Sequence, residues 1–398
     1  MGAAGFAIYV HVPFCTVKCG YCDFNAYAGM DSLKAAYADA LLAELRSWRL
    51  ALPDLPLASI GFGGGTPGEF PASDIGRVIS LAAAYRPLAA GAEVSLEANP
   101  GTSTLRGLAA FRAAGVTRIT FGAQSFDRDE LRFLERIHSP EATAASVRNA
   151  RAAGLADVGL DLIYGLPGQN GDGWRENLDR AIDLGPDHIS CYALTVEPGT
   201  LLAAKVARGE VIMPDQDSVA DLYEIAAKVL DASGYHQYEL SNWAREGHES
   251  RHNLAYWTDR PYLGIGAGAH GYIGGVRYEN LCHPRKYIAA CRALPPHGRD
   301  RVRAGGVIAA VHQASGEASM VDFVALRLRL VAGLAAGEFE ARFGRKPADV
   351  FGPALDQAVD AGLLDVDEAG LRLTRRGRLL HGEVVARLMA LAEGVRSV

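Results

Sequence analysis

The sequence has few of the features that mark secreted, membrane-spanning or nucleic-acid-binding proteins. Its formal net charge of −6 and its pI of about 6.0 provide no overall attraction for nucleic acid or for an anionic membrane. It has no uncharged apolar run near the roughly 18 residues that cross a bilayer. No basic segment marks a signal peptide, and Phe6 occupies the position where a myristoylation signal has Ser or Thr. These absences predict a cytoplasmic protein without a membrane span.

Cysteine is scarce as well: six occur in 398 residues, and three of them are scattered beyond residue 190 without indicating a disulfide scaffold. The other three, Cys15, Cys19 and Cys22, form a Cys-x₃-Cys-x₂-Cys pattern. A cubane iron–sulfur cluster normally takes four thiolates, so three leave one iron open for another ligand. A zinc site would need a fourth Cys or His at ligand spacing, and the neighbouring sequence has none. The pattern therefore favours a cluster, in a reducing compartment, over three unrelated thiols.

The first 235 residues alternate short apolar runs with amphipathic helical patterns. The runs typical of strands are 7–12, 58–62, 93–98, 118–123, 158–165 and 188–196. The helical patterns include 32–50, 102–114, 140–153 and 216–233. We expect Thr102 to cap the helix at 102–114. Repeated strand–helix units predict an α/β fold with a parallel sheet or barrel, in which the chemistry lies at the carboxyl ends of the strands.

Polar or glycine-bearing sequences follow these runs. The residues concerned, from the second run onward, are Gly64, Gly65, Thr66, Glu97, Gln124, Asp161 and Thr195. Glycines let backbone groups approach an ammonium group, and a strand-end carboxylate can accept hydrogen bonds from ribose hydroxyls. Singly, a glycine run is more often a tight turn and a lone carboxylate a solvated cap. Because the fold brings the strand ends to one rim, together they indicate a ligand site; Arg136 fits either this site or a helix surface.

The cysteine spacing resembles the cluster loop of the radical S-adenosylmethionine (SAM) superfamily. Residues 5–285 further resemble the family of oxygen-independent coproporphyrinogen III oxidases and their relatives. The shared motifs are YxHxPFC, GGGTP, SLEANPGT, FGAQSF, RIH, LDLIYGLPGQ and LTVEPGT. The resemblance implies a partial (βα)₆ barrel with one [4Fe–4S] cluster, held by three cysteines, and one or two SAM molecules. The SAM contacts that it implies are Tyr9, Tyr21, Gly64, Gly65, Thr66, Glu97, Gln124, Arg136, Asp161 and Thr195.

Three features separate this sequence from the oxidases of that family. The oxidases carry a further cysteine two residues after the third cluster ligand, where this sequence has Phe24. They also carry a long N-terminal arm, whereas we expect the first strand here by about residue 7. Residues 251–257, RHNLAYW, resemble the HNxxYW motif of the heme chaperone (HemW-like) branch, whose members bind heme and pass it to acceptor proteins. The resemblance implies a heme chaperone, with radical decarboxylation of coproporphyrinogen III as the alternative.

The HNxxYW motif supplies the candidate heme contacts His252, Asn253, Tyr256 and Trp257. A neutral imidazole can coordinate heme iron, and aromatic rings can pack on a porphyrin face. On chemistry alone a lone histidine is more often structural, with Tyr256 and Trp257 in the core; the resemblance favours heme. His270 is a further candidate ligand. The branch also implies heme-acceptor proteins, an electron donor to the cluster and a homodimer as partners.

The chain is long enough for a large domain and a smaller one. We expect a core barrel at 1–240, a motif-bearing extension at 241–295 and an accessory domain at 296–398. Between the last two, 292–316 has the composition of a linker or irregular crossing. Helical patterns at 319–332, 336–343, 351–363 and 376–394, with a strand-like pair, predict a winged-helix-like α+β module. Such modules often bind DNA, but the acidic stretch 353–369 and the lack of a Lys/Arg stripe argue against nucleic acid.

Overall fold

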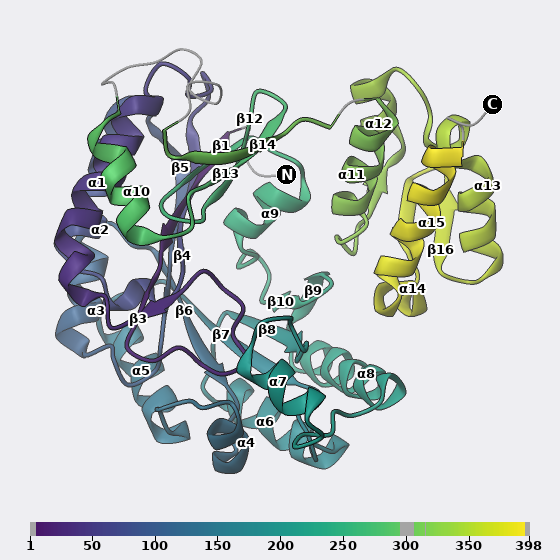
Figure 1. Cartoon of the computed structure of the whole chain (residues 1–398). Helices are drawn as coiled ribbons and strands as arrows, with labels where there is room; N and C mark the ends of the chain where they lie inside the picture. Colours follow the sequence, from purple (N-terminus) through teal and green to yellow (C-terminus); the bar gives the residue numbers. More distant parts are fainter. Residues whose placement is uncertain (1–4, 295–305, 315, 395–398) are drawn as a thin grey trace. The chain divides into compact units, whose positions relative to one another are not determined.

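The computed structural model describes residues 5–294, 306–314 and 316–394. The chain divides into two compact units, and each is assembled from several stretches (Figure 1). The first unit comprises Met1–His236, Trp243–His252 and Pro261–His312. The second comprises Gln237–Asn242, Asn253–Arg260 and Gln313–Val398. The expected division into 1–240, 241–295 and 296–398 stays a prediction.

Six parallel strands form the centre of the first unit. In spatial order they are β1 (Phe6–Val12), β4 (Leu57–Gly64), β5 (Leu88–Ala98), β6 (Arg118–Gln124), β7 (Asp157–Tyr164) and β8 (His188–Ala193) (Figure 1). The helices between them are α1 (Lys34–Trp48), α2 (Ala72–Tyr85), α3 (Leu105–Ala113), α4 (Arg128–Phe133), α5 (Pro140–Ala152) and α6 (Gly171–Asp183). Each strand pairs in parallel with the next, so their carboxyl ends share one rim. The predicted strand–helix units are confirmed.

The strands could be predicted from the sequence because both of their faces are covered, which makes their sequences largely apolar. In β1, the consecutive residues Phe6, Ala7 and Ile8, which point to opposite faces, are all fully buried, as expected when a parallel sheet is covered on both sides. The cap of α3 was predicted wrongly. Thr104 caps it by accepting from the Gly107 N–H at 3.1 Å, because Thr102 instead donates to the Asn99 carbonyl within the preceding turn.

Further strands extend the sheet beyond β1. The remaining elements of this part are β2 (Phe14–Cys15), β3 (Tyr27–Ala28), α7 (Leu201–Ala207), α8 (Gln216–Ala232), β10 (Asn242–Ala244), β11 (Tyr262–Ile265), β12 (His270–Ile273), β13 (Val276–Asn280), α10 (Pro284–Arg292) and β14 (Ile308–His312). β11 runs parallel to β1, and β12 to β14 follow as antiparallel neighbours. The irregular crossing expected at 292–316 is therefore wrong at 308–312, where β14 pairs with β13. Residues 295–305 and 315 of that expectation lie outside the described residues.

The second unit is an α+β module. Its elements are α11 (Glu317–Arg327), β15 (Leu334–Ala335), α12 (Ala336–Phe343), α13 (Pro347–Asp360), β16 (Leu364–Asp367), β17 (Gly370–Leu373), α14 (Arg375–Leu379) and α15 (His381–Gly394). Its sheet has the order β15-β17-β16, around a core that includes Phe339 and Phe351. β9 (His236–Glu239) and α9 (Arg251–Trp257) contribute residues to both units. Of the helices that the structure describes, none combines the length and the apolar character needed to cross a membrane.

Candidate functional site

The loop that follows β1 holds Cys15, Cys19 and Cys22 as free, half-buried thiols. The Cys22 N–H donates to the Cys19 carbonyl at 3.1 Å, and the short β2–β3 pair closes the loop. Desolvation raises the pKa of the Cys15 and Cys22 thiols, so their thiolates need a cation to stabilise them. All three side chains line one cavity of about 460 Å³. The loop therefore presents three thiols to one open cavity.

The same cavity gathers side chains from the ends of the parallel strands. The predicted SAM contacts that line it are Tyr21, Gly64, Gly65, Thr66, Glu97, Gln124, Arg136, Asp161 and Thr195. Their convergence follows from the shared rim of parallel strands. Among the predicted SAM contacts, Tyr9 alone does not line the cavity. Direct contact of these residues with SAM stays a prediction, which their convergence supports.

Hydrogen bonds connect two of the thiols through polar side chains on the cavity wall. Thr66 Oγ1 donates to Cys15 Sγ at 3.4 Å, and Asn99 Nδ2 donates to Thr66 Oγ1 at 3.0 Å. Arg136 completes the path, because its Nη2 donates to Asn99 Oδ1 at 2.5 Å and its Nη1 to Cys19 Sγ at 3.5 Å. The sequence reasoning did not assign Asn99 a role. Its place two residues after Glu97, at a strand end, was the signal that could have identified it.

The cavity wall fits a [4Fe–4S] cluster and SAM. Three thiols without a fourth leave one cluster iron for another ligand. The buried Nε of Arg136 has no hydrogen-bond partner among the described residues, so the wall keeps an unused cationic donor. A Cβ at Gly65 would lie 3.0 Å from Cys15 Sγ and 2.7 Å from the Phe14 carbonyl oxygen. Glycine there keeps space beside the thiol that any other residue would fill.

Backbone strain occurs at the same rim. Gln124 is a non-glycine residue with φ of 64°, in the left-handed region that L-residues rarely adopt. A Cβ at Gly122 would lie 2.8 Å from Gln124 Nε2 and 3.3 Å from Arg136 Nη2, so this glycine makes room for both side chains. Strain of this kind costs about 1–3 kcal/mol and persists where the surrounding structure enforces it. It marks Gln124 as a residue held in a specific orientation on the cavity wall.

Two carboxyl groups line the cavity with raised pKa values. Desolvation and, to a smaller extent, the charge of Asp161 raise the pKa of Glu97 to about 7, although a hydrogen bond from the Gly64 backbone opposes this. Desolvation also raises the pKa of Asp161 to about 6, although a hydrogen bond from Ser190 and the charge of Arg136 oppose this. A cationic or hydroxyl-rich ligand would relieve these unfavourable charges. The pair is therefore suited to a positively charged nucleoside such as SAM.

Tyr9 lies behind the cavity wall. Its hydroxyl is 2.9 Å from Nδ1 of His11, and burial raises the pKa of the phenol above its usual value. A Cβ at Gly63 would lie 3.0 Å from both Tyr9 Cε2 and Glu97 Oε1, so both side chains lie against this glycine. Tyr9 is thus adjacent to a cavity-lining carboxylate, and a direct contact with SAM stays a prediction.

None of the HNxxYW residues is among the residues that line the described cavity. His252 is 5% exposed, its Nδ1 is 2.9 Å from Ser59 Oγ, and burial lowers its pKa to about 4. In the second unit, the Tyr256 and Trp257 rings meet edge to face, and the Arg329 guanidinium lies 4.2 Å from the Trp257 ring centroid. The side chain of His270 is 68% exposed, and its Nε2 lies 3.9 Å from Glu279 Oε2. Heme contact by His252, Asn253, Tyr256 and Trp257 stays a prediction.

Comparisons with known proteins agree with this site. A model of the Radical SAM superfamily matches residues 9–181, and a model of the HemN C-terminal domain matches residues 314–380. Heme chaperone HemW of Mycobacterium tuberculosis (strain H37Rv) is 40% identical over 390 residues, which cover 96% of this chain and 95% of that protein. Heme chaperone HemW of Bacillus subtilis is 34% identical, with 94% and 97% covered. Heme chaperone HemW of Escherichia coli is 33% identical, with 96% and 98% covered.

The fold has a counterpart among solved structures. Coproporphyrinogen III oxidase (HemN) from Escherichia coli, described as a radical SAM enzyme, matches with a TM-score of 0.81. The match covers 96% of this chain and 90% of that one at 24% sequence identity, so the likeness concerns the fold alone. It confirms the expected barrel with a C-terminal accessory domain. The curated relatives go further: because they are similar along nearly the whole chain, this protein belongs to the HemW heme chaperone family within the radical SAM superfamily.

Proposed function

We propose that this chain binds heme and passes it to acceptor proteins, with a [4Fe–4S] cluster and SAM in the cavity of the first unit. One observation carries the proposal: Phe24 lines the cavity beside the three thiols and is 61% exposed. Val17 and Tyr192 line the same cavity and are also exposed, and a group of exposed apolar side chains at one cavity is typical of a ligand-binding groove. The full-length similarity to proteins named heme chaperones makes heme the natural candidate.

The wall residues would divide the work of holding the cluster and SAM. Cys15, Cys19 and Cys22 would bind three irons, and Arg136 would donate hydrogen bonds to the cluster sulfur ligands and to an anionic group of SAM. Glu97 would accept from the ribose hydroxyls once ionised. When bound, the cluster and SAM supply one-electron chemistry.

The rim of the cavity is suited to a porphyrin face. Phe24 is accompanied in the lining by Val17, 44% exposed, and Tyr192, 41% exposed. Flat apolar ligands bind through such contacts, since burying a large apolar side chain contributes about 1.5–3 kcal/mol. Lys18 also lines the cavity and offers a cation for a heme propionate.

The partners beyond heme also belong to this proposal. Passing heme on requires acceptor proteins, and reducing the cluster requires an electron donor. The three free cluster thiols suit the reducing cytoplasm, where disulfides are rare. A homodimer is expected from the family resemblance alone.

One anaerobic titration tests the proposal. The reconstituted protein is titrated with heme while the Soret band and the release of 5′-deoxyadenosine are recorded together. The proposal predicts saturable binding of heme with a shifted Soret band. A Soret band identical to that of free heme at every ratio would contradict it. Coproporphyrinogen III is incubated in parallel, and turnover to protoporphyrinogen would support the oxidase activity instead.

A further inference from the structure

A column of side chains runs through the interior of the barrel to the cluster loop. The Tyr9 ring stacks on the His252 imidazole, with centroids 6.2 Å apart and planes inclined by 29°. The Tyr9 hydroxyl is 2.9 Å from His11 Nδ1, and His11 Nε2 is 2.9 Å from the Asn25 carbonyl oxygen. The interior column consists of His252, Tyr9, His11 and Asn25.

The hydrogen bonds of the column have one direction. The Asn25 carbonyl can only accept, so His11 Nε2 carries a proton and donates it. Burial lowers the pKa of His11, which favours the neutral ring. Neutral His11 then has an unprotonated Nδ1, which accepts from the Tyr9 hydroxyl. The bond with Tyr9 therefore helps to fix the orientation of the His11 ring.

Strand β4 makes room for the column with its glycines. A Cβ at Gly61 would lie 2.4 Å from His252 Nε2, and a Cβ at Gly64 would lie 2.6 Å from His11 Cε1. Between them, a Cβ at Gly63 would lie 3.0 Å from Tyr9 Cε2. Three members of the column thus rest against three glycines of one strand. Gly63 and Gly64 of the GGG segment therefore serve this packing, and Gly64 also lines the cavity.

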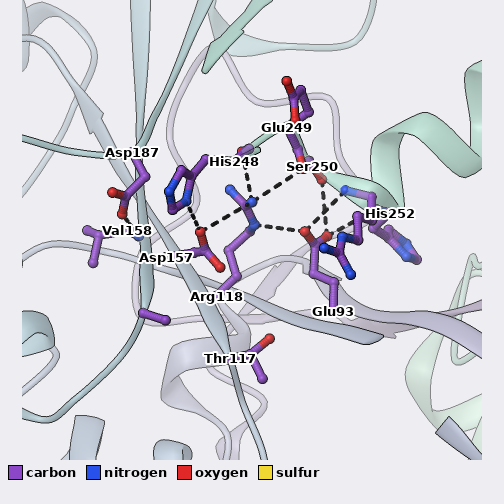
Figure 2. Close-up of polar contacts among 12 residues, drawn as sticks. Glu93, Thr117, Arg118, Asp157, Val158, Asp187, His248, Glu249, Ser250 and His252 are labelled. Carbon is purple, nitrogen blue, oxygen red and sulfur yellow. Dashed lines mark hydrogen bonds and ion pairs between the residues drawn. The ribbon is translucent and has the colours of Figure 1, made fainter. Parts of the chain in front are cut away.

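The end of the column at His252 is held by a buried ion pair. Glu93 accepts from Arg118 Nε at 2.9 Å and from the backbone N–H groups of Arg251 and His252 at 3.1 and 3.0 Å (Figure 2). Glu93 and Arg118 are 5% and 3% exposed. Together with the bond between the His252 ring and Ser59, these contacts hold His252 by its backbone and by its imidazole.

The neighbouring Asp157, Asp187 and His248 are close enough together to share a cation. Arginines already occupy their carboxylates, because Arg151 Nη2 lies 2.7 Å from Asp187 Oδ2 and Arg118 Nη2 lies 3.7 Å from Asp157 Oδ1. His248 bonds to Asp157 directly. This group is an ion-pair network that fastens the 248–252 segment to the starts of the strands.

The other end of the column, at Asn25, lies in the cluster loop. Asn25 stands three residues after Cys22, between Phe24 and Ala26, which both line the cavity. Its side-chain Nδ2 donates to the Ala267 and Cys282 carbonyls, both at 2.9 Å. Asn25 is therefore held from two sides, by His11 at its backbone and by these carbonyls at its side chain.

We propose that His252 is a positioning residue of the cluster and SAM site rather than an axial ligand of heme. It supports Tyr9, and through Tyr9 and His11 it fixes the Asn25 carbonyl and thereby the cluster loop. Its ring nitrogen Nδ1 and its ring face are both engaged inside the barrel. The inference rests on the proposed function for the cluster and SAM, and it assigns the histidine of the HNxxYW motif to that site.

The test compares His252→Ala, His252→Asn and a control, His381→Ala. Asparagine places an amide where the imidazole has Nδ1, so it keeps the contact with Ser59 but cannot ligate heme as imidazole does. His381 belongs to the second unit, where its Nε2 is 2.9 Å from the Ala325 carbonyl oxygen, and it is not a member of the column. Three quantities are measured in the full chain: hydrogen exchange over 13–28 without metal, SAM affinity after reconstitution, and the Soret band on heme addition.

The proposal predicts that His252→Ala speeds exchange over 13–28 and weakens SAM binding, each by about tenfold, with an unchanged Soret position. His252→Asn should recover most of both losses, and His381→Ala should leave exchange over 13–28 near wild type. A changed Soret band with wild-type exchange and SAM affinity would overturn the proposal. So would an Asn variant no better than the Ala variant. If even the wild type binds no heme, the proposed function fails, while exchange and SAM affinity still decide this inference.

Discussion

The guanidinium of Arg136 joins the sulfur of Cys19, 3.5 Å from Nη1, to two strand ends on the cavity wall. Its Nη2 donates to Asn99 Oδ1 at 2.5 Å and to the Gly122 carbonyl at 2.9 Å. Only a planar fork can make these contacts together, because a lysine ammonium is a single point of charge. The sequence allowed Arg136 to lie either on a helix surface or in the ligand site. The structure places it in the wall of the cavity that holds the cysteines.

Replacing Arg136 with lysine should therefore weaken SAM binding although the charge is kept. Losing one charge-assisted hydrogen bond costs about 1.5–3 kcal/mol, which corresponds to a tenfold or greater loss of affinity. Equilibrium binding of SAM to reconstituted protein measures this. Arg132→Lys is the matched control, since the Arg132 side chain is 76% exposed and pairs with Asp129 on the surface. Equal SAM affinity in the Arg136→Lys variant and the wild type would refute the role.

The raised pKa of Glu97 predicts a pH dependence of ligand-free stability. The pKa is about 7 in the folded chain, against about 4.3 in an unfolded one. Between these values the folded chain holds the proton more tightly, so stability is highest at low pH and falls as pH rises towards 7. Above pH 7 this contribution is constant. The difference in unfolding free energy between Glu97→Gln and wild type should follow this course, and a difference that is flat between pH 4.5 and 7 would count against it.

The same carboxylate should make SAM binding stronger above pH 7. The ionised Glu97 carboxylate can accept a hydrogen bond from a ribose hydroxyl at each of its two oxygens. In the protonated carboxyl group, one of these oxygens carries a proton and acts as a donor. SAM affinity of the wild type should rise between pH 6 and 8, while Glu97→Gln should show a smaller rise in the same range. Parallel curves for the two proteins would show that another group causes the change.

Gly61 should tolerate no side chain. A Cβ there would lie 2.4 Å from His252 Nε2, inside a packed interior, and overpacking of this kind costs about 1–3 kcal/mol. Gly61→Ala should therefore lower the free energy of unfolding measured with denaturant. The control is Gly76→Ala in α2, where a Cβ would meet only ordinary contact at 3.4 Å and helix propensity favours alanine by about 0.5–1 kcal/mol. Equal stabilities of the two variants would contradict the observed packing.

Phe24→Ala should weaken heme binding by tenfold or more and leave SAM binding within about twofold of wild type, because it removes an apolar contact of about 1.5–3 kcal/mol at the rim. Ile212→Ala is the control, since Ile212 is 84% exposed and is not part of the described cavity lining. Soret titrations of the three proteins give the comparison. A Phe24→Ala variant with wild-type heme affinity would place the heme elsewhere.

Local patterns predicted the barrel and the convergence of its strand ends, because both depend on short stretches of chain. A buried parallel strand such as Phe6–Val12 is largely apolar, and its carboxyl end faces the common rim. Glu97, one residue before the end of β5, could be placed at the rim by that rule; Asp161 lies inside β7, and the rule alone does not bring its side chain to the cavity.

Contacts between distant residues could not be predicted in this way. The stacking of Tyr9 on His252 joins positions 243 residues apart in sequence, and no periodicity encodes that pairing. The bond from Asn25 to the Ala267 carbonyl depends likewise on tertiary packing. β14 was missed because its short apolar run follows a stretch rich in Pro, Gly and Arg, whose composition dominated the window.

The most direct test of the proposed function is a transfer measurement. The purified chain is loaded with heme, freed of excess heme, and mixed with an apo-hemoprotein that carries a separable tag, in the presence of SAM and an intact cluster. The account predicts that the Soret band moves to the acceptor fraction faster than from an equal load of heme on serum albumin. Heme that stays with this chain, or moves no faster than from albumin, would contradict a chaperone function.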